Sequence, residues 1–104
     1  MFKGKKVLVL GLAKSGKAAV ELLKFMHADI TINESKKKED IPEYDTYVSE
    51  GIEMVCGGQP DELFERDFDF VVKNPGINYH APFILRLKER GIPVYTEIEL
   101  GYKV

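Results

Sequence analysis

Residues 7–10 form an apolar run that leads into a turn with glycines at Gly11 and Gly16. A short apolar run of this kind is typical of a parallel strand buried on both faces. Beyond the turn, apolar residues recur at the spacing of one helical face, at positions 19, 22, 23 and 26. The pattern predicts a strand, a tight turn and a helix over about 15–27. The first N–H groups of such a helix lack intrahelical partners and lie at the positive end of its dipole. We therefore predict that the turn binds a phosphate or pyrophosphate.

The remainder of the chain alternates between predicted strands and helices. β-branched and apolar runs predict strands over 29–33, 52–56, 68–72 and 93–95. Helical segments are expected over 44–51, 60–64 and 81–90, the last one opened by Pro82 and ended by Gly91. Thr96 and Glu99 form a capping box, so another helix should start there. It has at most two turns before Val104, which suggests a piece of a longer chain. The predicted fold is α/β, a Rossmann-like three-layer domain with a parallel sheet of about five strands.

Composition limits the classes of function. A chain of 104 residues with a formal net charge of -2 predicts one domain and offers no general case for nucleic-acid binding. Its single cysteine, Cys56, excludes an internal disulfide and suits a reducing cytoplasm, the predicted location. No apolar run approaches the roughly 20 residues of a membrane helix, so no membrane partner is expected.

Three turns with suggestive chemistry follow predicted strands, at 11–16, 33–36 and 74–77. Ligands of parallel sheets bind beyond the carboxyl ends of the strands, so these turns should converge on one site. The first turn reads Gly11-x-Ala13-x-x-Gly16, with alanine in place of the second glycine of the dinucleotide fingerprint. Lys14 and Ser15 add a charge and a hydroxyl there. The alternative is a purely structural turn whose glycines serve close packing.

The other two turns have ordinary alternatives as well. Glu34 stands where dinucleotide domains place the acid that holds the ribose hydroxyls, but it could equally be a surface acid. Residues 74–76 predict a type II turn, which could present main-chain groups to a planar base or be only structural. The lysines at 36–38 are expected in a solvated loop.

No catalytic or metal-binding constellation is recognisable. His27 and His80 stand alone, and Cys56 is expected to be a small buried residue. Lys17 follows Gly16 as in a Walker A motif, but Ala18 stands where magnesium would need a hydroxyl. We predict no catalytic residue and no metal in this domain.

The motifs at 11–16, 33–34, 74–77 and 96–100 occur in an order and at separations that resemble the N-terminal domain of the Mur ligases. The likeness covers essentially the whole chain, and it is greatest to the members that add D-glutamate to UDP-N-acetylmuramoyl-L-alanine in peptidoglycan synthesis. It implies that residues 1–104 bind the UDP end of this substrate. It also implies that ATP and Mg belong to central and C-terminal domains, which this chain lacks, so that this domain alone is not catalytic.

The resemblance assigns residues to the two ends of the UDP group. The pyrophosphate is expected at Lys14, Ser15 and Gly16. The uracil and its ribose are expected between two sets of residues: Glu34, Ser35 and Lys36, and Asn74, Pro75 and Gly76. Two alternatives remain open. One is an NAD- or nucleotide-sensing Rossmann regulatory module, which Glu34 favours and Ala13 disfavours. The other is an interaction domain that uses the lysines at 36–38.

Replacing Ser15 by alanine is expected to weaken substrate binding by about 1–3 kcal/mol, the usual loss for a hydrogen bond to a charged group. The measurement is a titration of the UDP-linked substrate into both proteins. An unchanged affinity would remove the hydroxyl from the binding scheme.

Overall fold

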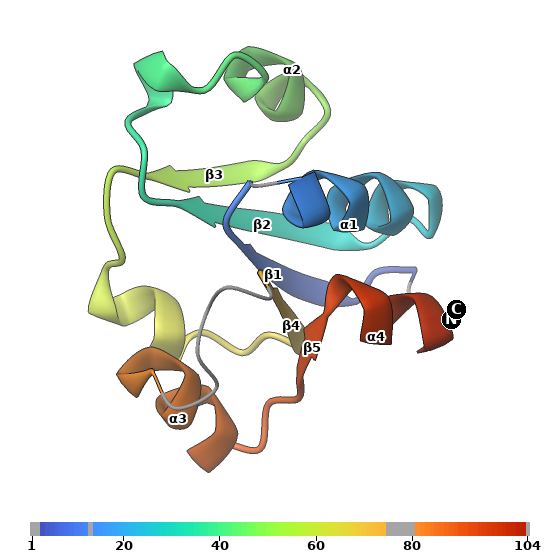
Figure 1. Ribbon diagram of the computed structural model, residues 1–104, viewed down its shortest axis with the longest axis vertical. Coiled ribbons are helices and arrows are strands. Elements are labelled where there is room, and N and C mark those ends of the chain that lie inside the picture. The colour runs from blue at the N-terminus through green and yellow to red at the C-terminus, as the bar shows by residue number, and fades with distance from the viewer. Residues whose placement is uncertain (1–2, 13, 75–80, 104) are drawn as a thin grey trace.

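A five-stranded parallel sheet forms the centre of the computed structural model, which describes residues 3–12, 14–74 and 81–103. In chain order the strands are β1 (Lys6–Leu10), β2 (Asp29–Glu34), β3 (Glu53–Cys56), β4 (Phe70–Lys73) and β5 (Val94–Thr96). The helices are α1 (Lys14–Phe25), α2 (Tyr44–Ser49), α3 (Pro82–Glu89) and α4 (Glu97–Lys103), with short 3-10 helices at Lys38–Asp40 and Asp61–Glu65. The strand order is β3-β2-β1-β4-β5 (Figure 1). This is the order of the Rossmann fold, so the predicted fold class is confirmed.

Two apolar cores, one on each face of the sheet, make the domain three-layered. Val7 and Val9 of β1 face a core built with α1 and α4, while Leu8 and Leu10 face one built with α3 and the 3-10 helix at Asp61–Glu65. All four of these β1 side chains are at most 1% exposed. Burial on both faces explains why β1 is apolar at every position rather than at alternate ones.

The strands are in register at their carboxyl ends. Leu10 of β1 pairs with Asn33 of β2 on one side and with Lys73 of β4 on the other. The residues that leave these strands therefore emerge together at one edge of the sheet. β2 and β3 extend the sheet on one side of β1, and β4 and β5 extend it on the other side. Open α/β sheets bind ligands at such a switch point, here between β1 and β4.

α1, α2 and α3 each end in a Schellman motif, in which two main-chain N–H groups just beyond the helix donate back to carbonyls of its last turn. After α2 and α3 the glycines at 51 and 91 take positive φ, as the sequence predicts. After α1 the same position is His27, with φ of 60°, and the N–H of Ala28 donates to the carbonyl of Leu23 at 3.1 Å. The helix therefore ends at Phe25, two residues before the predicted boundary. Histidine adopts positive φ less often than glycine and is therefore a weaker sign of a helix end. The apolar periodicity, which continues to position 26, extended the predicted helix past Phe25.

The predicted start of α4 is confirmed by both bonds of a capping box. The N–H of Thr96 donates to Glu99 Oε1 at 3.0 Å, and the N–H of Glu99 donates to Thr96 Oγ1 at 3.3 Å. β4 begins at Phe70 rather than at residue 68, where the main-chain N–H of Phe68 donates locally to the carbonyl of Arg66 at 3.2 Å instead of to a neighbouring strand.

Candidate functional site

The first turn of the chain is fastened to the end of β2. The N–H of Gly11 donates to the carbonyl of Asn33 at 2.8 Å, and the N–H of Leu12 donates to Glu34 Oε1 at 2.9 Å. Gly11 has φ of 91°, in the region that favours glycine, and a Cβ built on it would lie 3.9 Å from Cβ of Asn74. Two of the three predicted turns, and the first residue of the third, are thus brought together at the switch point.

Gly16 allows the start of α1 to lie against this turn. A Cβ built on Gly16 would lie 2.1 Å from the carbonyl oxygen of Gly11, a distance that no side chain can occupy. The structural reason for a glycine at position 16 is therefore close packing of helix and turn. The first turn of α1 also holds Lys14 and Ser15, and it contains no acidic side chain. The start of a helix has positive potential, because its first main-chain N–H groups lack partners within the helix.

Glu34 is buried, and its carboxylate accepts hydrogen bonds from the protein itself. Oε1 accepts the N–H of Leu12, and Oε2 accepts the N–H of Lys36 at 2.9 Å and the hydroxyl of Ser35 at 3.3 Å. Burial by itself would raise the pKa of this carboxyl group. The two main-chain bonds, with the Ser35 hydroxyl and the Lys36 charge, outweigh burial, so the pKa of Glu34 is lowered. Glu34 is therefore an anion that joins the first turn to the second.

Asn33 joins the end of β2 to the loop after β3. Its Nδ2 donates to the carbonyl of Val55 at 3.1 Å and to that of Gly58 at 2.7 Å. The N–H of Gly57 donates in turn to the carbonyls of Glu34 and Lys36, each at 3.0 Å. The sequence places Asn33 in the turn at 33–36, but it does not indicate that the Asn33 side chain holds the loop after β3, the fourth element of the site. The bonds from this side chain in β2 to β3 and to the loop after β3 can be seen only in the folded structure.

A cavity of about 340 Å³ opens among these strand ends. It is lined by residues from β1, β2, the loop after β3, the end of β4 and α3: Leu10, Gly11, Leu12, Asn33, Glu34, Ser35, Gln59, Asn74 and Phe83. A smaller hollow beside it is lined in part by Leu12, Lys17, Glu34 and Lys36. Of the predicted site residues, Glu34, Ser35 and Asn74 line the larger cavity, and Lys36 lines the smaller one. Lys14, Ser15 and Gly16 lie in the first turn of α1, and Pro75 and Gly76 lie outside the described residues.

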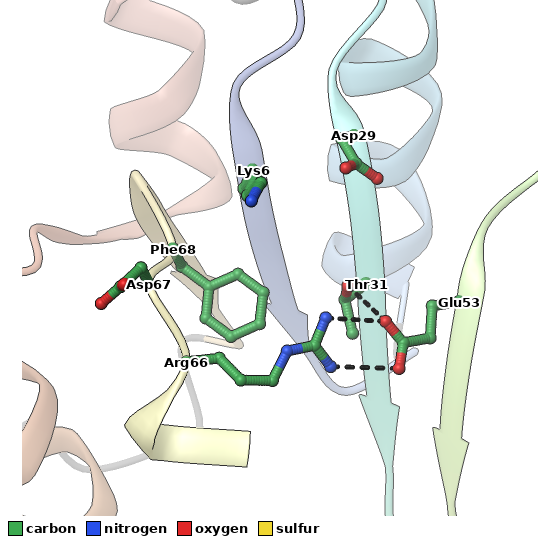
Figure 2. A pocket seen from close by; sticks show the side chains of 7 residues that line it. All are labelled: Lys6, Asp29, Thr31, Glu53, Arg66, Asp67 and Phe68. Carbon is green, nitrogen blue, oxygen red and sulfur yellow. Dashed lines mark hydrogen bonds and ion pairs between the residues drawn. The ribbon is translucent and has the colours of Figure 1, made fainter. Parts of the chain in front are cut away.

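A second hollow of about 340 Å³ lies near the opposite, amino-terminal ends of the strands (Figure 2). Its central groups are already bonded to one another. Both terminal nitrogens of Arg66 donate to the carboxylate of Glu53, at 3.0 and 2.8 Å, and the Thr31 hydroxyl donates to the same carboxylate at 3.3 Å. The guanidinium also lies 5.1 Å from the centre of the Phe68 ring. This cluster is self-contained, and we assign it no ligand.

Residues 3–12, 14–74 and 81–103 offer neither a metal-binding cluster nor a membrane-spanning helix. No group of three His, Cys, Asp or Glu side chains in these ranges could hold a metal ion. No helix in them is both long and apolar enough to cross a membrane. The cavity at the carboxyl ends of the strands is the candidate site.

Comparison with known proteins assigns the chain to a family. A family model described as the Mur ligase MurD-like N-terminal domain matches residues 5–96. The chain belongs to this family. A Streptococcus thermophilus protein named UDP-N-acetylmuramoylalanine--D-glutamate ligase is 51% identical over 102 residues, which are 98% of this chain and 23% of that protein. Relatives of the same name from Streptococcus uberis and Streptococcus pneumoniae are 48% and 50% identical over 103 residues.

The MurD-like chain thus spans about a quarter of the length of these curated relatives. Among solved structures, a shikimate dehydrogenase from Aquifex aeolicus matches 93% of the chain and 44% of its own length, with a TM-score of 0.55 at 15% identity. That likeness supports the Rossmann-like fold alone. The sequence-based assignment to the Mur ligases is confirmed.

Proposed function

We propose that this MurD-like domain binds the UDP group of UDP-N-acetylmuramoyl-L-alanine for a ligase that adds D-glutamate in peptidoglycan synthesis. One observation carries the proposal: half of the residues are identical, over 98% of the chain, to a relative whose name states this reaction. The ligation is expected to depend on ATP and Mg, bound by the central and C-terminal domains of a longer cytoplasmic enzyme. Residues 1–104 then form its N-terminal domain, and they contribute binding rather than catalysis.

The strand-end geometry is suited to such a ligand. The pyrophosphate is assigned to the first turn of α1, at Lys14, Ser15 and Gly16, where main-chain N–H groups and a lysine charge favour an anion. The domain's formal net charge of -2 offers no general attraction for an anion, so binding has to come from this local arrangement.

We assign the uracil and ribose to residues 34–36 and 74–76. Glu34 already accepts protein hydrogen bonds at both oxygens, but a carboxylate offers about four lone-pair sites. It can therefore both hold the first turn in place and accept a donor from the ligand. Ser35 and Asn74 line the same cavity.

An NAD-binding regulatory module is the second candidate, and the Rossmann strand order with an acid at the end of β2 favours it. In such modules that acid holds the two ribose hydroxyls. In this chain the carboxylate already accepts three protein hydrogen bonds, from Leu12, Ser35 and Lys36. About one lone-pair site is left for a ligand donor, whereas holding both ribose hydroxyls needs two.

Thermal unfolding with UDP, UDP-N-acetylmuramoyl-L-alanine, ADP and NAD separates the two functions. The UDP compounds are expected to stabilise the protein by about 2.7 kcal/mol at a hundredfold excess over Kd, and NAD is not. In NMR titrations the amide signals of Ser15, Glu34 and Gly76 should shift together, while those of the Arg66–Glu53 cluster serve as the control. Preferential stabilisation by NAD would decide for the regulatory module.

A further inference from the structure

The loop after β3 is held rigidly beside the cavity. Asn33, only 3% exposed, donates to the carbonyls of Val55 and Gly58, and the Gly57 N–H donates to two carbonyls at the end of β2. Four hydrogen bonds thus hold Val55, Gly57 and Gly58, within the four residues that precede Gln59. Pro60 follows directly, and its ring restricts the backbone on the other side. The position of Gln59 at the cavity wall is therefore set before any ligand binds.

The side chain of Gln59 has hydrogen-bonding capacity to offer. It is exposed and lines the cavity, and its amide makes no hydrogen bond within residues 3–12, 14–74 and 81–103. The neighbouring polar groups are already engaged: Ser35 donates to Glu34, and Asn33 donates to the β3 loop. Gln59 thus brings an unused carbonyl and an unused NH₂ to this wall.

Phe83 of α3 lines the same cavity and adds an aromatic surface. Its ring is partly buried and packs on Phe64, with 5.3 Å between the ring centres. An aromatic side chain and an unused amide in one cavity are the two groups with which proteins bind a nucleobase, since the ring contacts the face and the amide bonds to the edge.

The distance of Gln59 from the first turn indicates which part of the ligand it contacts: the base rather than the phosphates. β3 lies two strands from β1, which at about 4.8 Å per strand is roughly 10 Å from the turn that receives the pyrophosphate. A ligand whose diphosphate lies at the start of α1 can reach that far with its nucleoside. We propose that Gln59 is a specificity-determining residue, which hydrogen-bonds to the edge of the pyrimidine base while Phe83 contacts its face. This proposal rests on the UDP-binding function proposed above.

The test is to measure Kd for UDP and CDP, which differ only in the base, with the unaltered protein and three variants. Gln59→Ala should weaken UDP binding about tenfold, the effect of losing two hydrogen bonds of ordinary strength. Gln59→Glu should lower the preference for UDP over CDP at least tenfold, because a carboxylate accepts from the cytosine amino group and repels the uracil carbonyls. Glu62→Gln, an exposed position in the same segment outside the cavity, is the control and should change neither Kd.

Thermal unfolding midpoints of the Gln59 variants should equal that of the unaltered protein, because the side chain makes no bond within the described fold. If the unaltered protein binds UDP and the Gln59 variants bind UDP and CDP with the same constants as it does, this inference is overturned and the proposed function stands. An unaltered protein that binds no UDP overturns the proposed function and this inference with it.

Discussion

Replacing Gly16 by alanine is expected to destabilise the domain by about 3 kcal/mol or more, at the upper end of what inserting a methyl group into a packed interior costs. The added Cβ would lie 2.1 Å from the carbonyl oxygen of Gly11 and 3.0 Å from its carbonyl carbon. Both atoms are main chain, so no side-chain rotation relieves the contact. Either α1 moves away from the turn or the turn moves away from β2.

Urea unfolding of the two proteins measures this effect, and Gly101→Ala is the matched control. Gly101 is also helical, in α4, but a Cβ there would meet nothing within 4 Å. Alanine at 101 should therefore raise the free energy of unfolding by about 0.5–1 kcal/mol through helix propensity alone. Similar changes in both variants would show that the contact with Gly11 does not matter. UDP binding should also weaken in Gly16→Ala, because the displaced helix start carries the proposed pyrophosphate site.

Replacing Glu34 by glutamine is expected to lower the free energy of unfolding at pH 7 by about 2–3 kcal/mol, the usual range when a buried, charge-assisted hydrogen-bond acceptor is lost. Glutamine keeps the size of the side chain and one oxygen. Its NH₂, however, must face the N–H of Leu12 or that of Lys36, so one buried donor loses its acceptor. The site should loosen too, because this carboxylate joins the first turn to the second.

The stability difference between the original protein and Glu34→Gln should depend on pH, in a direction that the lowered pKa of Glu34 sets. Because the pKa of Glu34 is lowered in the fold, its contribution to stability is complete above the ordinary glutamate pKa of about 4.3. The contribution is lost as the pH falls through the lowered value. The difference between the original protein and Glu34→Gln should therefore be largest at neutral pH and should narrow in acid. Urea unfolding at pH 7 and below pH 4 measures it, with Glu62→Gln as an exposed control expected to change stability by less than about 0.5 kcal/mol. A difference that stays constant with pH would mean that ionised Glu34 does not hold the turns.

Local patterns in the sequence predict the elements of this fold well. The apolar run at 7–10, the glycine stops at 51 and 91, and the capping box of Thr96 and Glu99 each have a physical cause within a few neighbouring residues. Where the local signal is weak, prediction fails. α1 ends at Phe25 because His27 takes the positive φ that glycine usually takes, and helical periodicity alone carries the predicted end to residue 27.

Part of the candidate site could be predicted from local patterns, and the rest depends on contacts between residues far apart in the chain. The turns after β1, β2 and β4 could be foreseen to meet, because parallel strands place their carboxyl ends at one edge. The structure places Gly11, Glu34 and Asn74 there together. It also adds Gln59 and Phe83, which no local motif marks, and it gives Asn33 a role in holding the β3 loop. Their roles depend on the alignment of β2 with β3 and on the packing of α3, which are set by contacts between residues far apart in the chain.

By itself, the sequence determined that this protein alternates strands and helices around a buried parallel sheet, and that a glycine turn precedes its first helix. Each of these follows from the periodicity, turn residues and caps of one segment. Only the tertiary structure decided that the Glu34 carboxylate holds two turns and that Asn33 fixes the β3 loop. It also decided that the Gln59 amide lines the cavity without a hydrogen bond to any residue that the structure describes. Those outcomes depend on which groups meet across neighbouring strands, and hydrogen bonds between distant residues form only once the sheet has set its register.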